Sequence, residues 1–160
     1  MVEWEDRIRD LSKMFAFQIM THTITIEERL KDIICMSIDK KRSNVIKFSN
    51  YFDNISLDKK IPLAKLILEC NYPEILQKYP NIFSTIGQIK KWRNDLAHLN
   101  RYFEINHMSN NETYLVLHNR SVSKQKKLTE KKMYSIMQMA EKCSLDMLKI
   151  TNLVAEENRY

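Results

Sequence analysis

Hydrophobic residues recur at steps of three and four along most of this chain, which is the spacing of one face of an α-helix. Two such stripes come first: Trp4, Ile8, Leu11, Phe15 and Ile19, then Ile26, Leu30, Ile33 and Ile34. Between them, Thr25 and Glu28 resemble a capping box that opens a second helix. The β-branched run Thr21–Ile26 also fits a bend in one long helix. The pattern predicts either two helices or one bent helix before the polar connection Asp39–Asn44.

Three more helices are predicted in the middle of the chain. The first is short, or else an irregular segment, and has the apolar positions Val45, Phe48, Phe52 and Ile55. Ser56–Ile61 is predicted to be a turn, and Pro62 fits the first position of the next helix, where its missing N–H costs no hydrogen bond. Tyr72 and Pro73 end that helix. The third opens near Pro80 and has the apolar face Ile82, Ile86, Ile89 and Leu96.

The pattern then changes to short runs rich in Tyr, Phe, Val and Ile. Arg101–Asn106 and Thr113–Asn119 are two such runs, and the polar residues Ser109, Asn110 and Asn111 separate them, so a small β-hairpin is predicted. Thr129 is predicted to cap a last long helix. Its apolar stripe is Met133, Met137, Ala140, Ser144, Met147, Leu148 and Val154, and its methionines fit a core better than a binding surface. The fold class is therefore all-α, a helical bundle with a small β-hairpin inserted before the last long helix.

Composition agrees with a mainly helical protein, because the 160 residues include one Gly and three Pro. At this length we expect a single domain, residues 1–160, that buries a core. Cys35, Cys70 and Cys143 follow no metal-site spacing, and we expect reduced, buried thiols in a cytoplasmic protein. The acidic N-terminus is unlike an export signal, and the longest uncharged run, Met14–Ile26, is too short to span a membrane.

The chain is basic, with a net charge of +6 and a pI of about 9.2. This balance favours an anionic partner such as a nucleic acid. Several familiar chemistries are absent from the sequence. Gly87 is the only glycine, so no glycine-rich phosphate loop exists, and the four histidines lack metal-ligand spacing. What remains is acid–base and electrostatic chemistry by His, Arg and Asn, which requires neither a metal nor an organic cofactor.

The most informative stretch is Lys90–Asn100, at the end of the predicted third helix of the middle region. Taking about 100° per residue, Arg93 lies within about 20° of the centre of the apolar stripe, which suggests partial burial. Asn94 and His98 are four residues apart on one flank, so their side chains are neighbours. Gly87 lies further back on that flank, and a glycine inside a helix suggests the close approach of another group.

The hexapeptide Arg93-Asn94-Asp95-Leu96-Ala97-His98 resembles the Arg-x4-His signature of the HEPN superfamily, and the order of the elements agrees with it. The resemblance implies a HEPN-like bundle and a metal-independent endoribonuclease of a toxin–antitoxin or phage-defence system. It also implies RNA as substrate and an antitoxin or immunity protein as a further partner. Other HEPN proteins are catalytically inactive modules that bind nucleotides or partners, and this is the alternative function.

The chemistry of RNA cleavage independently suits these residue types. Attack of a 2′-hydroxyl on the adjacent phosphate leaves a 2′,3′-cyclic phosphate and requires a base, an acid and a cation. His98 can transfer protons, Arg93 can bind the phosphate, and Asn94 can orient either group. Because one chain supplies one such histidine, we expect a homodimer through the helix that carries Gly87, Asn94 and His98. The structural alternatives are a buried ion pair for Arg93 and a helix-terminal cap for His98.

Basic residues near the hexapeptide are candidate phosphate contacts. They are Lys90, Lys91, Arg101, Lys124, Lys126 and Lys127, and the alternative for all six is a solvated surface. Trp92 and Tyr102 are able to stack on bases, although packing in the core or at the dimer contact fits them better. Some HEPN toxins carry a tyrosine two residues after the histidine, as a target of a nucleotidyltransferase antitoxin. Asn100 stands there in this chain, so the resemblance does not extend to that route of control.

Overall fold

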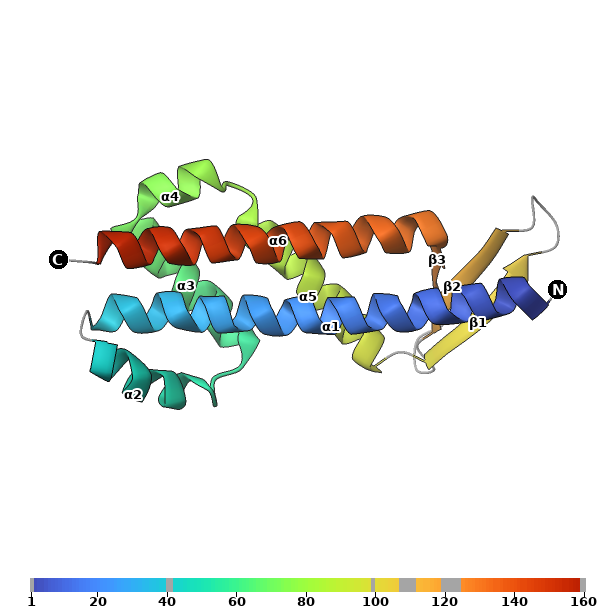
Figure 1. The fold of residues 1–160 in the computed structure, drawn as a ribbon, viewed down its shortest axis with the longest axis horizontal. Coiled ribbons are helices and arrows are strands. Elements are labelled where there is room, and N and C mark those ends of the chain that lie inside the picture. The colour runs from blue at the N-terminus through green and yellow to red at the C-terminus, as the bar shows by residue number, and fades with distance from the viewer. Residues whose placement is uncertain (1, 40–41, 99, 107–111, 119–124, 159–160) are drawn as a thin grey trace. The chain divides into compact units, whose positions relative to one another are not determined.

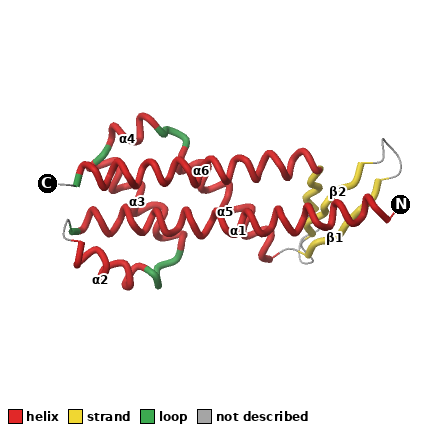
Figure 2. The backbone as a smooth tube through the Cα atoms, in the orientation of Figure 1, coloured by secondary structure: helices red, strands yellow, loops and turns green. Residues whose placement is uncertain are grey.

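The computed structural model describes residues 2–39, 42–98, 100–106, 112–118 and 125–158. Within them, helices dominate and a small antiparallel sheet precedes the last long helix, so the all-α class is confirmed (Figures 1 and 2). The helices are α1 (Val2–Ile38), α2 (Arg42–Phe52), α3 (Leu57–Asn71), α4 (Pro73–Lys78), α5 (Ile82–His98) and α6 (Glu130–Glu157). The strands are β1 (Asn100–Asn106), β2 (Glu112–His118) and β3 (Gln125–Thr129). Among the helices described, none has the length and apolar character that crossing a bilayer requires.

Two compact units are formed, and α1, α5 and α6 each contribute residues to both. One unit consists of Met1–Thr23 and Gly87–Glu141, and the other of Ile24–Ile86 and Lys142–Tyr160. The first contains the sheet and the hexapeptide, and the second contains α2, α3 and α4. The organisation of residues 1–160 as one domain stays a prediction.

The N-terminal region is one uninterrupted helix, so the prediction of a capping box at Thr25 and Glu28 is wrong. The hydroxyl of Thr23 donates a hydrogen bond to the carbonyl of Ile19, with 2.7 Å between the oxygens. This bond satisfies the threonine inside the helix, where it would otherwise compete with the backbone. Thr23 is 5% exposed and continues the apolar stripe from Ile19 to Ile26 in phase. With no glycine or proline in this run, nothing in it ends the helix.

In the second unit, α3 begins at Leu57, so the prediction that Pro62 opens this helix is wrong. Pro62 lies inside the helix and lacks the N–H that would bond to the carbonyl of Asp58. Two interactions favour the earlier start. Asp58 is in the first turn, where the helix dipole favours a carboxylate. Lys60 is 3% exposed and donates from Nζ to Oε1 of Glu27 on α1 at 2.7 Å.

Beyond α3, Pro73 opens α4, a short helix that the sequence pattern did not predict. The buried Tyr72 joins this region to the residue that follows α6, because Nδ2 of Asn158 donates to the Tyr72 hydroxyl at 2.9 Å. On α6 the predicted cap is confirmed, since the N–H of Lys132 donates to Oγ1 of Thr129 at 3.1 Å. Most of the predicted α6 stripe is buried, but Leu148 is 39% exposed, so its assignment to the core is wrong.

In the first unit, β1, β2 and β3 follow one another in an antiparallel sheet. The predicted hairpin corresponds to β1 and β2, in which Phe103 faces Leu115. The third strand was not predicted, because it lies inside the basic run and contributes a single buried apolar residue, Leu128, opposite Leu115. The central strand β2 is buried at Leu115, Val116 and Leu117, so side chains on both of its faces are covered.

The cysteines differ in their surroundings. Cys35 and Cys143 are buried, and burial raises the pKa of both thiols, that of Cys143 to about 12. Cys70 is exposed on α3, so the expectation of three buried thiols is wrong for this residue. It lies off the buried stripe of α3, which Lys60, Ala64 and Leu68 form.

The buried pair between Lys60 and Glu27 gives a first prediction. Glu27→Gln removes the negative charge while keeping the shape, and it leaves the ammonium of Lys60 buried without a counter-charge. We expect the free energy of unfolding to fall by about 1–3 kcal/mol, since Glu27 itself is partly exposed. Urea denaturation measures the change, and Glu141→Gln, at an exposed position of α6, is the matched control. Equal stability of the two variants would show that the pair does not hold α3 to α1.

Candidate active site

The hexapeptide forms the last six residues of α5. Leu96 is 2% exposed and anchors this end of the helix in its unit. Arg93, Ala97 and His98 are exposed, and Asn94 is half-buried. The polar groups proposed for catalysis are therefore accessible to a ligand, on a helix end that a buried leucine holds in place.

Arg93 is exposed, so the prediction of its partial burial is wrong. Ile82, Ile86 and Ile89 form an apolar stripe on the side of α5 where Arg93 lies. At the last two turns of the helix, Trp92 and Leu96 are the residues covered by the rest of the unit, and Arg93 is left exposed. There the half-buried Trp92 packs edge-on against Phe15 of α1, with ring centroids 6.3 Å apart and planes at 72°. A long arginine stem can also follow an apolar surface while its charged end stays in water.

The structure brings two of the three predicted catalytic residues together. Nη1 of Arg93 donates a hydrogen bond to Oδ1 of Asn94 at 3.1 Å. The amide oxygen of Asn94 thus restrains one edge of the guanidinium. The remaining N–H groups of the guanidinium can bind the oxygens of a phosphate. The orienting role in catalysis that the sequence suggests for Asn94 stays a prediction.

His98 is the last residue of α5, and it stands apart from Arg93. Five residues of helix turn the chain by about 140° and advance it by about 7.5 Å, so the two side chains leave different sides of α5. Asn94 and His98 are four residues apart and share one flank. The amide of Asn94 therefore lies between Arg93 and His98, on the flank that carries the imidazole and bonded to the guanidinium through its oxygen.

Asp95, inside the hexapeptide, is a residue whose role the sequence did not reveal. Its carboxylate accepts a charge-assisted hydrogen bond from Nζ of Lys126 on β3. The same ammonium lies 5.0 Å from the ring centroid of Trp92, within the range of a cation–π interaction. We call Phe15, Trp92, Asp95 and Lys126 the Trp92 cluster. It ties α1, α5 and β3 together at the end of α5.

The predicted RNA contacts now fall into different surroundings. Lys91 and Lys127 are exposed, Lys90 is half-buried, and Lys126 is engaged by Asp95. Arg101 belongs to β1, and Lys124 lies outside the described residues. Asp95 binds the ammonium of Lys126, whereas the exposed positions of Lys91 and Lys127 make their side chains accessible to a phosphate.

Gly87 is exposed on α5, five residues after the helix begins. A Cβ placed on it would meet no atom within 4 Å in the part of the chain that the structure describes. The close approach expected at this glycine is thus not made by the described residues of its own chain. In the same residues, no three His, Cys, Asp or Glu side chains gather as a metal site requires.

The Trp92 cluster gives a second prediction. Asp95→Asn keeps the shape of the side chain but removes the charge that Lys126 binds. We expect the free energy of unfolding to fall by about 1 kcal/mol, because the Lys126 side chain is 36% exposed and water weakens the pair.

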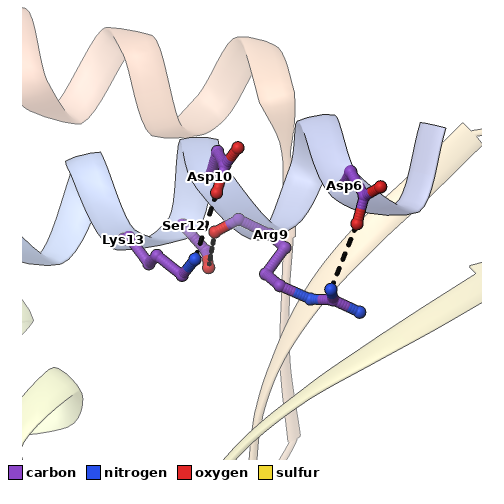
Figure 3. Close-up of polar contacts among 5 residues, drawn as sticks. All are labelled: Asp6, Arg9, Asp10, Ser12 and Lys13. Atoms are coloured by element: carbon purple, nitrogen blue, oxygen red, sulfur yellow. Dashed lines mark hydrogen bonds and ion pairs between the residues drawn. The ribbon is translucent and has the colours of Figure 1, made fainter. Parts of the chain in front are cut away.

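The matched control is Asp6→Asn, which breaks the surface pair between Asp6 and Arg9 on α1 (Figure 3). Both of these side chains are more than half exposed, so the melting temperature of this control should equal that of the wild type. A loss of stability no larger for Asp95→Asn than for the control would contradict a structural role for the cluster.

Comparison of the chain with protein-family models, with curated proteins and with solved structures finds no match. The resemblance to the HEPN superfamily stays a prediction, and it rests on the hexapeptide and on the order of the elements. What the chain does is therefore argued from the side chains at the end of α5.

Proposed function

We propose that this protein is a metal-independent endoribonuclease of HEPN type, with Arg93, Asn94 and His98 as its catalytic residues. The observation that carries the proposal is the exposure of Arg93 and His98 at one anchored helix end, with Asn94 bonded to the guanidinium. An arginine that served only as a buried ion pair would be covered and paired with a carboxylate. Arg93 is exposed, and the hydrogen bond described for it goes to an amide.

The reaction needs no group beyond the chain and its substrate. The 2′-hydroxyl of a ribose loses its proton to a base and attacks the adjacent phosphorus, while the 5′-oxygen of the next nucleotide leaves and takes a proton from an acid. The products are a 2′,3′-cyclic phosphate and a free 5′-hydroxyl. Imidazole suits both proton transfers near neutral pH. The guanidinium of Arg93 stabilises the charge that develops on the phosphorane oxygens.

A second copy of the chain completes this site in our proposal. One chain supplies one histidine, whereas the reaction uses a base and an acid. Arg93 and His98 also leave α5 about 140° apart, so pairing two such helices is a direct way to bring a guanidinium and two imidazoles to one phosphate. The open surface at Gly87 allows a neighbouring backbone to approach α5 closely. We therefore propose that the homodimer forms through the face of α5 that carries Gly87, Asn94 and His98.

The cellular setting follows from the resemblance alone. We propose a cytoplasmic enzyme of a toxin–antitoxin or phage-defence system, with an antitoxin or immunity protein as its regulator. Lys91 and Lys127 would contact the RNA backbone beside the site, and such contacts make binding weaken as salt rises.

The third prediction concerns the catalytic residues. In excess EDTA, the wild-type protein should cleave mixed cellular RNA and leave a cyclic phosphate on the upstream fragment. His98→Ala and Arg93→Ala should each abolish cleavage, and Asn94→Ala should lower the rate less. Since Arg93 and His98 are exposed, each loss should leave the free energy of unfolding within about 0.5 kcal/mol of the wild type.

Gln88→Ala is the matched control, because Gln88 is exposed on α5 and takes no part in the proposed site. All proteins are purified identically and compared by gel analysis and by phosphate end-labelling. Equal cleavage by the wild type and His98→Ala would assign the activity to another site or to a contaminant. No cleavage by any of them would favour the inactive nucleotide- or partner-binding module.

A further inference from the structure

The outer side of α1 exposes large apolar residues. Phe17 is 72% exposed, Met20 37% and Ile24 56%. They follow one another at steps of three and four, so they form one stripe along the helix. The opposite side of α1 carries its buried residues, among them Phe15 and Ile19. Because α1 is one uninterrupted helix (Figure 1), the spacing of these residues follows from helical geometry alone.

Charged residues continue the stripe at both ends. Asp10 and Lys13 precede it, and Glu28 and Lys31 follow it on the same side of the helix. Figure 3 shows the ion pair between Asp10 and Lys13, 3.1 Å long, on this part of α1. Both of its side chains are more than two-thirds exposed, so the pair contributes little and is free to rearrange. We call the residues from Asp10 to Lys31 on this side the outer stripe of α1.

The order of the charges is self-complementary when two copies of the helix run antiparallel. A two-fold axis between Met20 and Thr21 sets Phe17 opposite Ile24 of the second copy. The same axis sets Lys13 opposite Glu28, and every such contact occurs twice because of the symmetry. Asp10 then faces Lys31 of the second copy. Because Nζ of Lys31 already lies 2.6 Å from Oδ1 of Asp53 in its own chain, Asp10 adds electrostatic attraction but no new hydrogen bond. We propose that the outer stripe of α1 binds the outer stripe of a second copy of this chain in this antiparallel register.

Other arrangements of the two helices bring like charges together. A parallel pair places Lys13 on Lys13 and Glu28 on Glu28. Sliding the antiparallel helices by three residues in one direction sets Asp10 against Glu28, and in the other direction it sets Lys13 against Lys31. Like charges in direct opposition are unfavourable, so the charge order disfavours a parallel pair and a slip of one turn in either direction.

Charge also distinguishes a second copy from other partners. The four charges of the outer stripe, Asp10, Lys13, Glu28 and Lys31, sum to zero, whereas the chain as a whole carries +6. A nucleic acid gains no net attraction from such a surface. A second copy meets a neutral, self-complementary surface there, and Phe17, Met20 and Ile24 of each copy leave water. This contact is distinct from the proposed pairing through α5, whose Trp92 packs on the opposite side of α1.

Cross-linking tests the orientation and the register. In a Cys70→Ser background, which removes the exposed thiol, Met20→Cys places a reactive group beside the two-fold axis. A short bismaleimide should join most of this variant into dimers at micromolar concentration. The matched control is Asp6→Cys, which is also exposed on α1. In the proposed register the two copies of position 6 lie about 44 Å apart, so this variant should stay monomeric on a denaturing gel. Equal cross-linking of the two variants, or none of Met20→Cys, would overturn the proposal.

Charge reversal then tests the contact itself. Lys13→Glu and Glu28→Lys, each added to the Met20→Cys background, set like charges opposite each other, and each should cross-link roughly tenfold less than the parent. In a mixed dimer of the two variants, position 13 of each copy again faces an opposite charge at position 28 of the other, so cross-linking should recover. The yield at Met20→Cys reports this contact alone, so neither pairing through α5 nor RNA cleavage affects the result. No recovery on mixing would contradict the proposed pairing.

Discussion

The edge-on contact between Trp92 and Phe15, together with the ammonium of Lys126 over the indole, decides which side of α5 is buried at its last two turns. The candidate site depends on this choice. With Trp92 and Leu96 turned into the unit, Arg93 and His98 are left to solvent and Asn94 stays within reach of the guanidinium. A helix held by the periodic stripe alone would have placed Arg93 at the centre of its buried side.

The Trp92 cluster also holds the end of α5 rigidly, as a catalytic group would require. Asp95 fixes α5 to β3 through Lys126, one residue beyond Asn94 and two before Ala97. Side chains that act on a reacting phosphate need to be held within a fraction of an ångström, and packing behind them provides this. The hexapeptide thus combines two kinds of residue. Asp95 and Leu96 anchor the helix, and Arg93, Asn94 and His98 are the residues that we propose for catalysis.

Much of the fold could be predicted from the sequence, since long apolar stripes with almost no glycine leave few alternatives to helices. The errors have local causes. Thr23 satisfies its hydroxyl within α1, so a β-branched run that suggested a break does not make one. Strand β3 carries one buried apolar residue among lysines and depends on pairing with β2, which no local pattern reveals. The burial of Arg93 was predicted wrongly because the packing of Trp92 against Phe15 is a tertiary contact, which the periodicity of α5 does not reveal.

The central claim is that the exposed end of α5 is where RNA binds and reacts, and nuclear magnetic resonance tests it most directly. An oligonucleotide built of 2′-deoxyribose can occupy the site but cannot be cleaved, because it lacks the attacking hydroxyl. Titrated into isotope-labelled protein, it should shift the backbone and side-chain signals of Arg93, Asn94 and His98 more than any others. Shifts that leave these three residues unchanged and gather on another surface would contradict the account.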